Sequence, residues 1–228
     1  MTPLHRHQIA RVTSAGWETV LQLKWDKTAR ACISHWAAHS LPLVVTRQKT
    51  GDIQAQGTIA FGLPAPQRWD RRRLVINIAR HQIIYFDEFP SGEKLTQLLP
   101  RAAREAWLRL CGGLKRQHIV VRVYGSYGWQ QISGLDHVHK ASDVDVWVSV
   151  SSREQADIAS EILQNFDCPS LTLDGELVFN GDCAVNWREW LAWRGGRAKA
   201  ILVKTCTGSM LANSFQASGP HCLVESVS

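Results

Sequence analysis

Short apolar runs separated by turn residues dominate the first 90 residues and predict β-strands. The runs are rich in Val and Ile, with Gly, Pro or charged residues between them. They are LPLVVT (41–46), GTIAFGL (57–63), LVINI (74–78) and HQIIYF (81–86). The polar segment DEFPSGEK (87–94) follows them. We therefore expect a small β-rich N-terminal domain over residues 1–90, with the boundary in this segment.

From residue 95 the apolar positions recur every three or four residues, which indicates one face of a helix. Pro100 should divide this stretch into a short turn and a longer helix, and Gly112-Gly113 should end it. Further strands are predicted at 118–124, 143–150 and 171–179, and helices at about 152–166 and 186–193. The last apolar run, AILVKT (200–205), fits a buried strand or a helix.

The second part of the chain therefore mixes strands with helices. We expect a mixed-sheet domain with flanking helices over residues 91–207, and an α/β (α+β) class for the whole chain. Residues 208–228 are rich in Ser, Ala, Asn and Gly and are expected to be a disordered tail.

Composition narrows the class of protein. The chain has 228 residues, of which 45% are hydrophobic and 20% charged, and this argues against disorder and fibrous folds. It has no apolar run of the ~18–20 residues that span a bilayer, and its N-terminus lacks the apolar core of a secretory signal. The six scattered cysteines are therefore expected to be reduced thiols in a cytoplasmic protein with no membrane partner.

The charge balance favours anionic partners. Lys and Arg total 26 against 20 Asp and Glu, which gives a formal charge of +6. Four arginines within six residues, Arg68, Arg71, Arg72 and Arg73, follow a Pro-containing connector. Because the guanidinium fork pairs well with phosphate and carboxylate, we expect these arginines to bind an anion. The alternative is a solvated loop without a partner.

The sharpest candidate for chemistry is Gly125-Ser126, followed after sixteen residues by Asp143-Val-Asp145. Side chains at i and i+2 of a strand share a face, so the two carboxylates should converge while the intervening valines face the core. Paired carboxylates suit Mg²⁺, which prefers oxygen ligands and retains sites for substrate phosphates. A Gly-Ser turn brings backbone N–H groups close to phosphate oxygens. Together these elements predict a metal–phosphate site.

A third carboxylate should complete the site. Asp174 and Glu176 share one face of the next predicted strand, and Asp174 is preferred because its side chain is shorter; alternatively, Asp174-Gly175 is a hairpin turn. Lys204 lies in an apolar stretch and either contacts a triphosphate or reaches solvent. Histidines such as His7 have no partners at metal-ligand spacing and are assigned no role.

Several segments together resemble the malonate decarboxylase holo-acyl-carrier-protein synthase family, also called phosphoribosyl-dephospho-CoA transferases, which is nucleotidyltransferase-like. The similarity covers roughly residues 5–205. It is carried by PLVVTRQ (42–48), IAFGLPAPQRWDRRRL (59–74), VYGSYGWQQISGLDHVHKASDVDVWV (123–148), LDGELVF (173–179), VNWREWL (185–191) and ILVKT (201–205).

The resemblance implies a two-domain enzyme that uses 2′-(5″-triphosphoribosyl)-3′-dephospho-CoA. Such an enzyme transfers the phosphoribosyl-dephospho-CoA prosthetic group to a serine of the apo acyl carrier protein subunit of malonate decarboxylase and releases diphosphate. By match to the family motif, Gly125 and Ser126 would hold phosphates, and Asp143 and Asp145 would bind Mg²⁺. The arginines at 68–73 would then face the acidic carrier or the substrate phosphates.

Two other functions fit parts of the sequence. A different nucleotidyltransferase could move AMP from ATP to a hydroxyl acceptor with the same carboxylates. A non-catalytic nucleic-acid-binding protein would explain the positive charge, but the chain shows no aromatic and basic ribbon of the RNA-binding type. We therefore expect no nucleic-acid partner.

Overall fold

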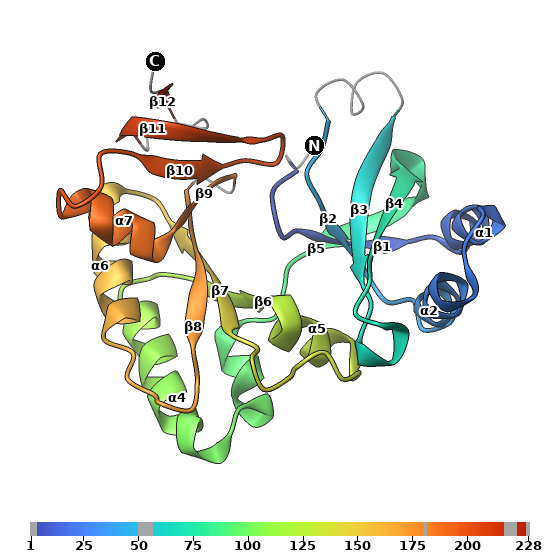
Figure 1. The fold of residues 1–228 in the computed structure, drawn as a ribbon, viewed down its shortest axis with the longest axis horizontal. Coiled ribbons are helices and arrows are strands. Elements are labelled where there is room, and N and C mark those ends of the chain that lie inside the picture. The colour runs from blue at the N-terminus through green and yellow to red at the C-terminus, as the bar shows by residue number, and fades with distance from the viewer. Residues whose placement is uncertain (1–3, 50–56, 180–181, 217–222, 227–228) are drawn as a thin grey trace.

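Two β-sheets with helices packed on them make up the computed structural model (Figure 1). The structure describes residues 4–49, 57–179, 182–216 and 223–226. The first sheet has the order β4-β3-β2-β1-β5 and is antiparallel throughout. We call it the N-terminal sheet. Its strands are β1 (Ile9–Val12), β2 (Leu43–Val45), β3 (Thr58–Pro64), β4 (Arg73–Ala79) and β5 (Ile83–Asp87).

Alternation along β3 and β4 gives the N-terminal sheet one buried face. Phe61 pairs with Ile76, and both are almost fully buried, whereas Val75 on the opposite face is 65% exposed. The short 3₁₀ helices η1 (Gln67–Trp69) and η2 (Arg80–Gln82) lie at the two ends of β4. The apolar runs therefore form strands close to the expected bounds.

Two helices cover the buried face of this sheet, and the sequence interpretation did not include them. They are α1 (Ser14–Gln22) and α2 (Lys27–Ala38), and Thr13 and Asp26 cap their N-termini. Ala29, Ile33 and Trp36 of α2 are buried at the spacing of one helical face. This part of the chain is a sheet with two helices packed on it.

The second sheet, which we call the C-terminal sheet, has the order β12-β11-β10-β9-β8-β7-β6. Only β7 and β8 run parallel, so the sheet is mixed. Its strands are β6 (Val121–Tyr124), β7 (Val144–Val150), β8 (Leu173–Phe179), β9 (Cys183–Asn186), β10 (Ile201–Lys204), β11 (Ser209–Gln216) and β12 (Leu223–Ser226). With the helices, this confirms the expected α+β class.

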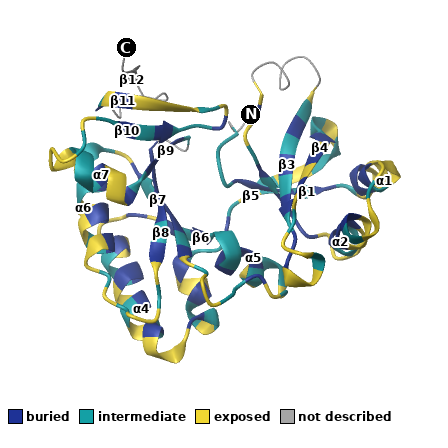
Figure 2. Cartoon of the chain, viewed as in Figure 1, coloured by how far each residue is buried: buried dark blue, intermediate teal, exposed yellow. Residues whose placement is uncertain are grey.

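Most helices lie on one face of the C-terminal sheet, and the other face is turned toward the N-terminal sheet; the helix that follows β6 lies between β6 and the N-terminal sheet (Figure 1). The helical elements are η3 (Gly92–Leu98), α4 (Arg101–Arg116), α5 (Gly125–Ser133), α6 (Arg153–Gln164) and α7 (Trp187–Arg194). Val144, Val146 and Val148 of β7 are fully buried in the core, as the alternation predicts. Figure 2 shows the burial of β7 among the other strands of this sheet. Asp145 of β7 therefore lies on the face toward the N-terminal sheet.

Two details of this part of the chain bear on the sequence expectations. Pro100 does separate η3 from α4, but α4 continues through Gly112-Gly113 to Arg116, because Leu114 in its last turn is fully buried in the core. Asp174-Gly175 lies inside β8 and is not a hairpin turn.

The stretch expected to be a disordered tail contributes two strands instead. β11 pairs with β10 over four residues of each strand, and its Ala212 and Phe215 are buried in the core. The prediction failed because buried apolar residues are interspersed with the polar ones.

The cysteines differ in part from the expectation of six reduced thiols. Cys32, Cys111 and Cys206 are free and buried, and Cys168 is free and half-buried, whereas Cys183 is disulfide-bonded. No helix in the described ranges combines the length and the apolar character needed to cross a membrane.

Direct contacts join the two sheets. The backbone N–H of Gln48 donates to the carbonyl of Cys206 (2.8 Å), and that of Gln67 donates to the carbonyl of Asp136 (3.1 Å). A small apolar cluster of Ile9, Phe89 and Trp129 also bridges the sheets. The face of the C-terminal sheet that helices leave open therefore has the N-terminal sheet as its opposite wall.

Candidate active site

Helix α5 begins directly where β6 ends, and its first residue is Gly125. Gly125 has φ +61°, which disfavours any residue with a Cβ, and a Cβ there would lie 1.9 Å from Oδ2 of Asp145. Only glycine lets this carboxylate approach the start of the helix so closely. The N–H groups of the first turn of α5 have no partners within the helix, so Gly125 and Ser126 sit at an anion-attracting terminus.

Two of the predicted aspartates are neighbours across parallel strands. Asp145 of β7 is in register with Asp174 of β8, and strands in a sheet lie about 4.8 Å apart. Gly175 has φ +147°, and a Cβ there would lie 2.0 Å from the carbonyl oxygen of Val146. Asp143 immediately precedes β7, two residues from Asp145 and exposed. The fold therefore brings all three aspartates to one end of β7 and β8.

This end of the sheet is electrostatically unbalanced. Burial raises the pKa of Asp145 to about 6, and the like charges of Asp174, Asp143 and Glu176 add to the shift. A carboxylate in such surroundings is stabilised by a cation or by a proton. The cluster therefore favours binding of a positively charged ligand.

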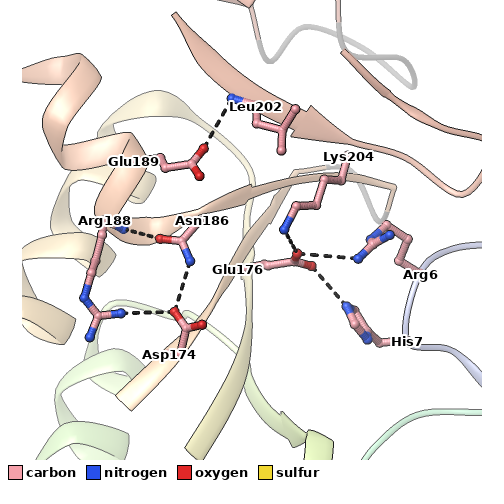
Figure 3. A network of polar contacts seen from close by, with 9 residues as sticks. All are labelled: Arg6, His7, Asp174, Glu176, Asn186, Arg188, Glu189, Leu202 and Lys204. Atoms are coloured by element: carbon pink, nitrogen blue, oxygen red, sulfur yellow. Dashed lines mark hydrogen bonds and ion pairs between the residues drawn. The ribbon is translucent and has the colours of Figure 1, made fainter. Parts of the chain in front are cut away.

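Asp174 is held in place from one side. Its Oδ1 accepts hydrogen bonds from Nδ2 of Asn186 (3.0 Å) and Nη1 of Arg188 (3.0 Å). Asn186 also caps α7 by accepting from the backbone N–H of Arg188. Figure 3 shows this group on one side of β8. These contacts fix the orientation of the Asp174 carboxylate.

Glu176, two residues along β8, has a different environment. Its Oε1 accepts from Nζ of Lys204 (2.9 Å) and lies 3.5 Å from Nη2 of Arg6, and its Oε2 accepts from Nε2 of His7 (3.0 Å), as Figure 3 shows. The side chain is only 5% exposed. We call Glu176, Arg6, His7 and Lys204 the Glu176 network.

The network holds Glu176 in its ionised form. Burial alone would raise the pKa of Glu176, but the hydrogen bond from His7 and the charges of Arg6 and Lys204 hold it at about 2. Burial lowers the pKa of His7, so its ring is neutral near pH 7 and donates its Nε2–H. The ring of His7 also stacks on Tyr124 at 3.9 Å, next to the start of α5. The network therefore ties the N-terminal segment to both β8 and β10.

A cavity of about 610 Å³ opens between the two sheets, which is within the range typical of ligand pockets. We call it the inter-sheet cavity. The C-terminal part contributes Tyr124, Gly125, Ser126, Trp129, His137 and Asp145 to its wall. The N-terminal part contributes Arg6, His7, Val44, Val45, Thr46, Arg47, Gly62, Leu63, Pro64, Arg73, Leu74, Val75 and Phe89. The helix terminus and Asp145 thus share one cavity with three arginines.

The four clustered arginines have separate positions. Arg72 pairs with Asp26 (2.6 Å), Arg68 stacks on the ring of Trp69 (3.8 Å to the ring centre), and Arg71 donates to the side chain of Gln67 (3.3 Å). Arg73 alone of the four lines the inter-sheet cavity. An anion-binding surface made of all four stays a prediction, as does a phosphate contact of Lys204, which bonds to Glu176.

The donor set can be compared with the needs of Mg²⁺. Within the described part of the chain, no three Asp, Glu, His or Cys side chains are grouped so that they could hold a metal ion by themselves. Mg²⁺ commonly takes one or two carboxylates and completes its shell with waters and substrate phosphates. Asp143 and Asp145 supply such a pair beside the N-terminus of α5, so these residues fit the ion.

Sequence reasoning missed several residues of the cavity and the network. Arg6 and His7 are separated from Glu176 by about 170 residues, so no spacing rule could connect them. Asn186 had a local signal, because an Asn at the start of a predicted helix is typical of a helix cap; the backbone N–H that it accepts from is that of Arg188.

Two family models match this chain, one over each of its two parts. Residues 92–214 match the model described as the phosphoribosyl-dephospho-CoA transferase MdcG C-terminal domain, and residues 5–89 match the corresponding N-terminal domain. A phosphoribosyl-dephospho-CoA transferase of Bradyrhizobium diazoefficiens is 30% identical over 215 residues, which are 94% of this chain and 92% of the relative. One of Xanthomonas axonopodis pv. citri is 32% identical, over 84% of this chain and 85% of the relative. No solved structure matches.

Proposed function

The chain belongs to the phosphoribosyl-dephospho-CoA transferase family, and on that premise we propose its reaction. The enzyme transfers the phosphoribosyl-dephospho-CoA group from 2′-(5″-triphosphoribosyl)-3′-dephospho-CoA to a serine. That serine belongs to the apo acyl carrier protein subunit of malonate decarboxylase, and diphosphate is the second product.

One observation carries the proposal: the glycine-opened terminus of α5 and the Asp145 carboxylate face a common cavity. Gly125, Ser126 and Asp145 all line it, and Arg6, Arg47 and Arg73 line it as well. Helix N–H groups and guanidinium groups are suited to the oxygens of a polyphosphate. The triphosphate of the donor fits this distribution of charge.

Asp143 and Asp145 would hold Mg²⁺ in this site. When bound, Mg²⁺ supplies charge stabilisation for the phosphates and for the departing diphosphate. The raised pKa of Asp145 supports this assignment, because Asp145 lies among other carboxylates and no basic side chain of the described residues pairs with it. Glu176 is less suited to the role, since Arg6, His7 and Lys204 already occupy its oxygens.

Asp174 is the best-placed general base. Asn186 and Arg188 occupy its Oδ1, which orients the carboxylate and leaves Oδ2 to accept the proton of the carrier serine. The serine oxygen then forms a bond to the phosphorus next to the ribosyl carbon. The bond from that phosphorus to the diphosphate oxygen breaks, and diphosphate leaves with the electron pair.

The test measures the intact mass of the apo carrier protein after incubation with the enzyme and the donor. We expect a mass gain equal to one phosphoribosyl-dephospho-CoA group with Mg²⁺ present and none in excess EDTA. A carrier whose serine is replaced by Ala should gain no mass. A gain equal to AMP with ATP as donor, and none with the triphosphoribosyl donor, would contradict the proposal and favour an AMP transferase.

A further inference from the structure

His137 lies in the wall of the inter-sheet cavity with an unsatisfied polar atom. The residue is 7% exposed, and its Nε2 is buried with no hydrogen-bond partner among the described residues. More than nine in ten buried polar groups in native proteins have a partner. The imidazole of this cavity-lining residue therefore retains hydrogen-bonding capacity that no described residue uses, which points to a partner supplied by the ligand.

The surroundings fix His137 firmly. The side-chain oxygen of Gln130 accepts from the backbone N–H groups of His137 (3.2 Å) and Val138 (2.9 Å). The ring has two indole neighbours, with ring centres 6.3 Å away for Trp36 and 6.4 Å away for Trp129. An ordered ring in a fixed position can select a ligand group by geometry, because little flexibility is lost on binding.

The charge state of the ring limits what it can bind. Burial lowers the pKa of His137 to about 4, with a smaller opposing effect of Asp136. The imidazole is therefore neutral near pH 7 and offers one donor or acceptor without a positive charge. It suits an uncharged polar group better than a phosphate.

The position of His137 relative to α5 agrees with this. Trp129, its ring neighbour, lies one helical turn after Gly125 and Ser126, roughly 6 Å along the axis. All of these residues line the same cavity. A ligand that places its phosphates at the start of α5 can therefore extend along the helix toward His137.

We propose that the imidazole of His137 hydrogen-bonds an uncharged polar group of the dephospho-CoA part of the donor, either the adenine ring or an amide of the pantetheine arm. The inference rests on the proposed function, because it assumes that the donor occupies the inter-sheet cavity. It adds a residue that sets which donor is accepted and that does not take part in the phosphoryl transfer.

The test is equilibrium binding of dephospho-CoA to the full chain by calorimetry. His137→Phe keeps a flat ring but removes the nitrogen, and His137→Gln keeps a polar group near the position of Nε2. His81→Phe is the matched control, since His81 is exposed and outside the cavity wall. Circular dichroism checks folding, and His137→Leu replaces the Phe variant if that variant does not fold. Inorganic diphosphate with Mg²⁺ probes the phosphate end separately.

We expect His137→Phe to weaken dephospho-CoA binding about tenfold, His137→Gln to stay within about threefold, and diphosphate binding to be unchanged. AMP and 4′-phosphopantetheine then separate the two sources, because only the fragment that contacts His137 loses affinity in the Phe variant. Equal affinity of the parent and the Phe variant for dephospho-CoA would overturn this inference alone. An equal loss for diphosphate would also overturn it, since it would indicate a general defect. Failure of the parent to bind dephospho-CoA would instead contradict the proposed function and the inference with it.

Discussion

Two acidic regions lie side by side on the open face of the C-terminal sheet, and their surroundings shift the pKa of the central carboxyl group in opposite directions. At the end of β7 and β8, Asp145 stands among other carboxylates, and its pKa rises to about 6. Two residues further along β8, Glu176 receives three basic side chains, and its pKa is held at about 2. No basic side chain of the described residues pairs with Asp145, so we call the first region incomplete; Glu176 has three basic partners, so we call the second region complete. Whether an acidic residue on a strand is available to a ligand or serves to hold the fold together thus depends on which basic side chains the fold places next to it.

The largest effect should come from the incomplete region. Asp143→Asn and Asp145→Asn keep the shape of the side chains but remove the charge that would hold Mg²⁺. A loss of ~3–5 kcal/mol in transition-state stabilisation would slow transfer by about 10²–10⁴-fold. The mass gain of the carrier protein per unit time measures this, and circular dichroism should show an unchanged fold. Full activity in the double variant would remove Asp143 and Asp145 from the site.

A substitution in the complete region should lower the stability of the protein. Glu176→Gln leaves Arg6 and Lys204 without their buried carboxylate, and removing one partner of a buried ion pair lowers the free energy of unfolding, here by about 3 kcal/mol. For a chain of this size, the Tm should fall by about 6–12 °C. Glu93→Gln is the control, because its pair with Lys115 is exposed and such pairs contribute little. Equal Tm shifts in the two variants would contradict an anchoring role.

The two regions should also differ in pH dependence. The pKa of Asp145 is higher in the folded chain than its usual 3.8, so folding is opposed increasingly as pH rises from about 4 to 6. Without Mg²⁺, Asp145→Asn should therefore stabilise the protein at pH 7 by up to about 2 kcal/mol and give no gain at pH 4. Glu176 contributes stability above pH 4.5, which is lost as pH falls toward 2. Denaturant unfolding across this range measures both trends.

Saturating Mg²⁺ should remove the advantage of Asp145→Asn at pH 7, because only the parent retains both ligands. Binding of Mg²⁺ to the parent should weaken as pH falls through about 6, since protons compete for Asp145. Affinity that does not change between pH 7 and pH 5 would place the ion elsewhere.

The smallest expected effect is a difference in donor affinity between substitutions at two of the clustered arginines. Arg73→Ala removes a charge from the cavity wall and should weaken donor binding about fivefold at low salt and less at high salt. Arg72→Ala is the matched control, since Arg72 is paired with Asp26 and should leave donor affinity unchanged. Affinity that falls equally in both variants would support a general basic surface instead.

The positions of the residues in the incomplete region were predictable from the sequence, and those of the complete region were not, for a physical reason. Alternation around Asp143 and Asp145 is local, and strand geometry alone puts the valines in the core and the aspartates opposite. The Glu176 network joins residues from the two ends of the chain, which only the tertiary fold brings together. No element was predicted for residues 27–38, although Ala29, Ile33 and Trp36 of α2 have helical spacing.

The link from Arg6 and His7 to Glu176 and Lys204 has a consequence for the order of events during synthesis. A ribosome makes the N-terminal segment first. About 170 further residues must be synthesised before Glu176 can pair with Arg6, and nearly 200 before Lys204 can join the network. At 5–20 residues per second this delay is on the order of ten seconds or more, long enough for a small sheet to form on its own. Closing so long a loop is also entropically unfavourable. The wall of the inter-sheet cavity that contains Arg6 and His7 is therefore among the last parts of the molecule to reach its final structure.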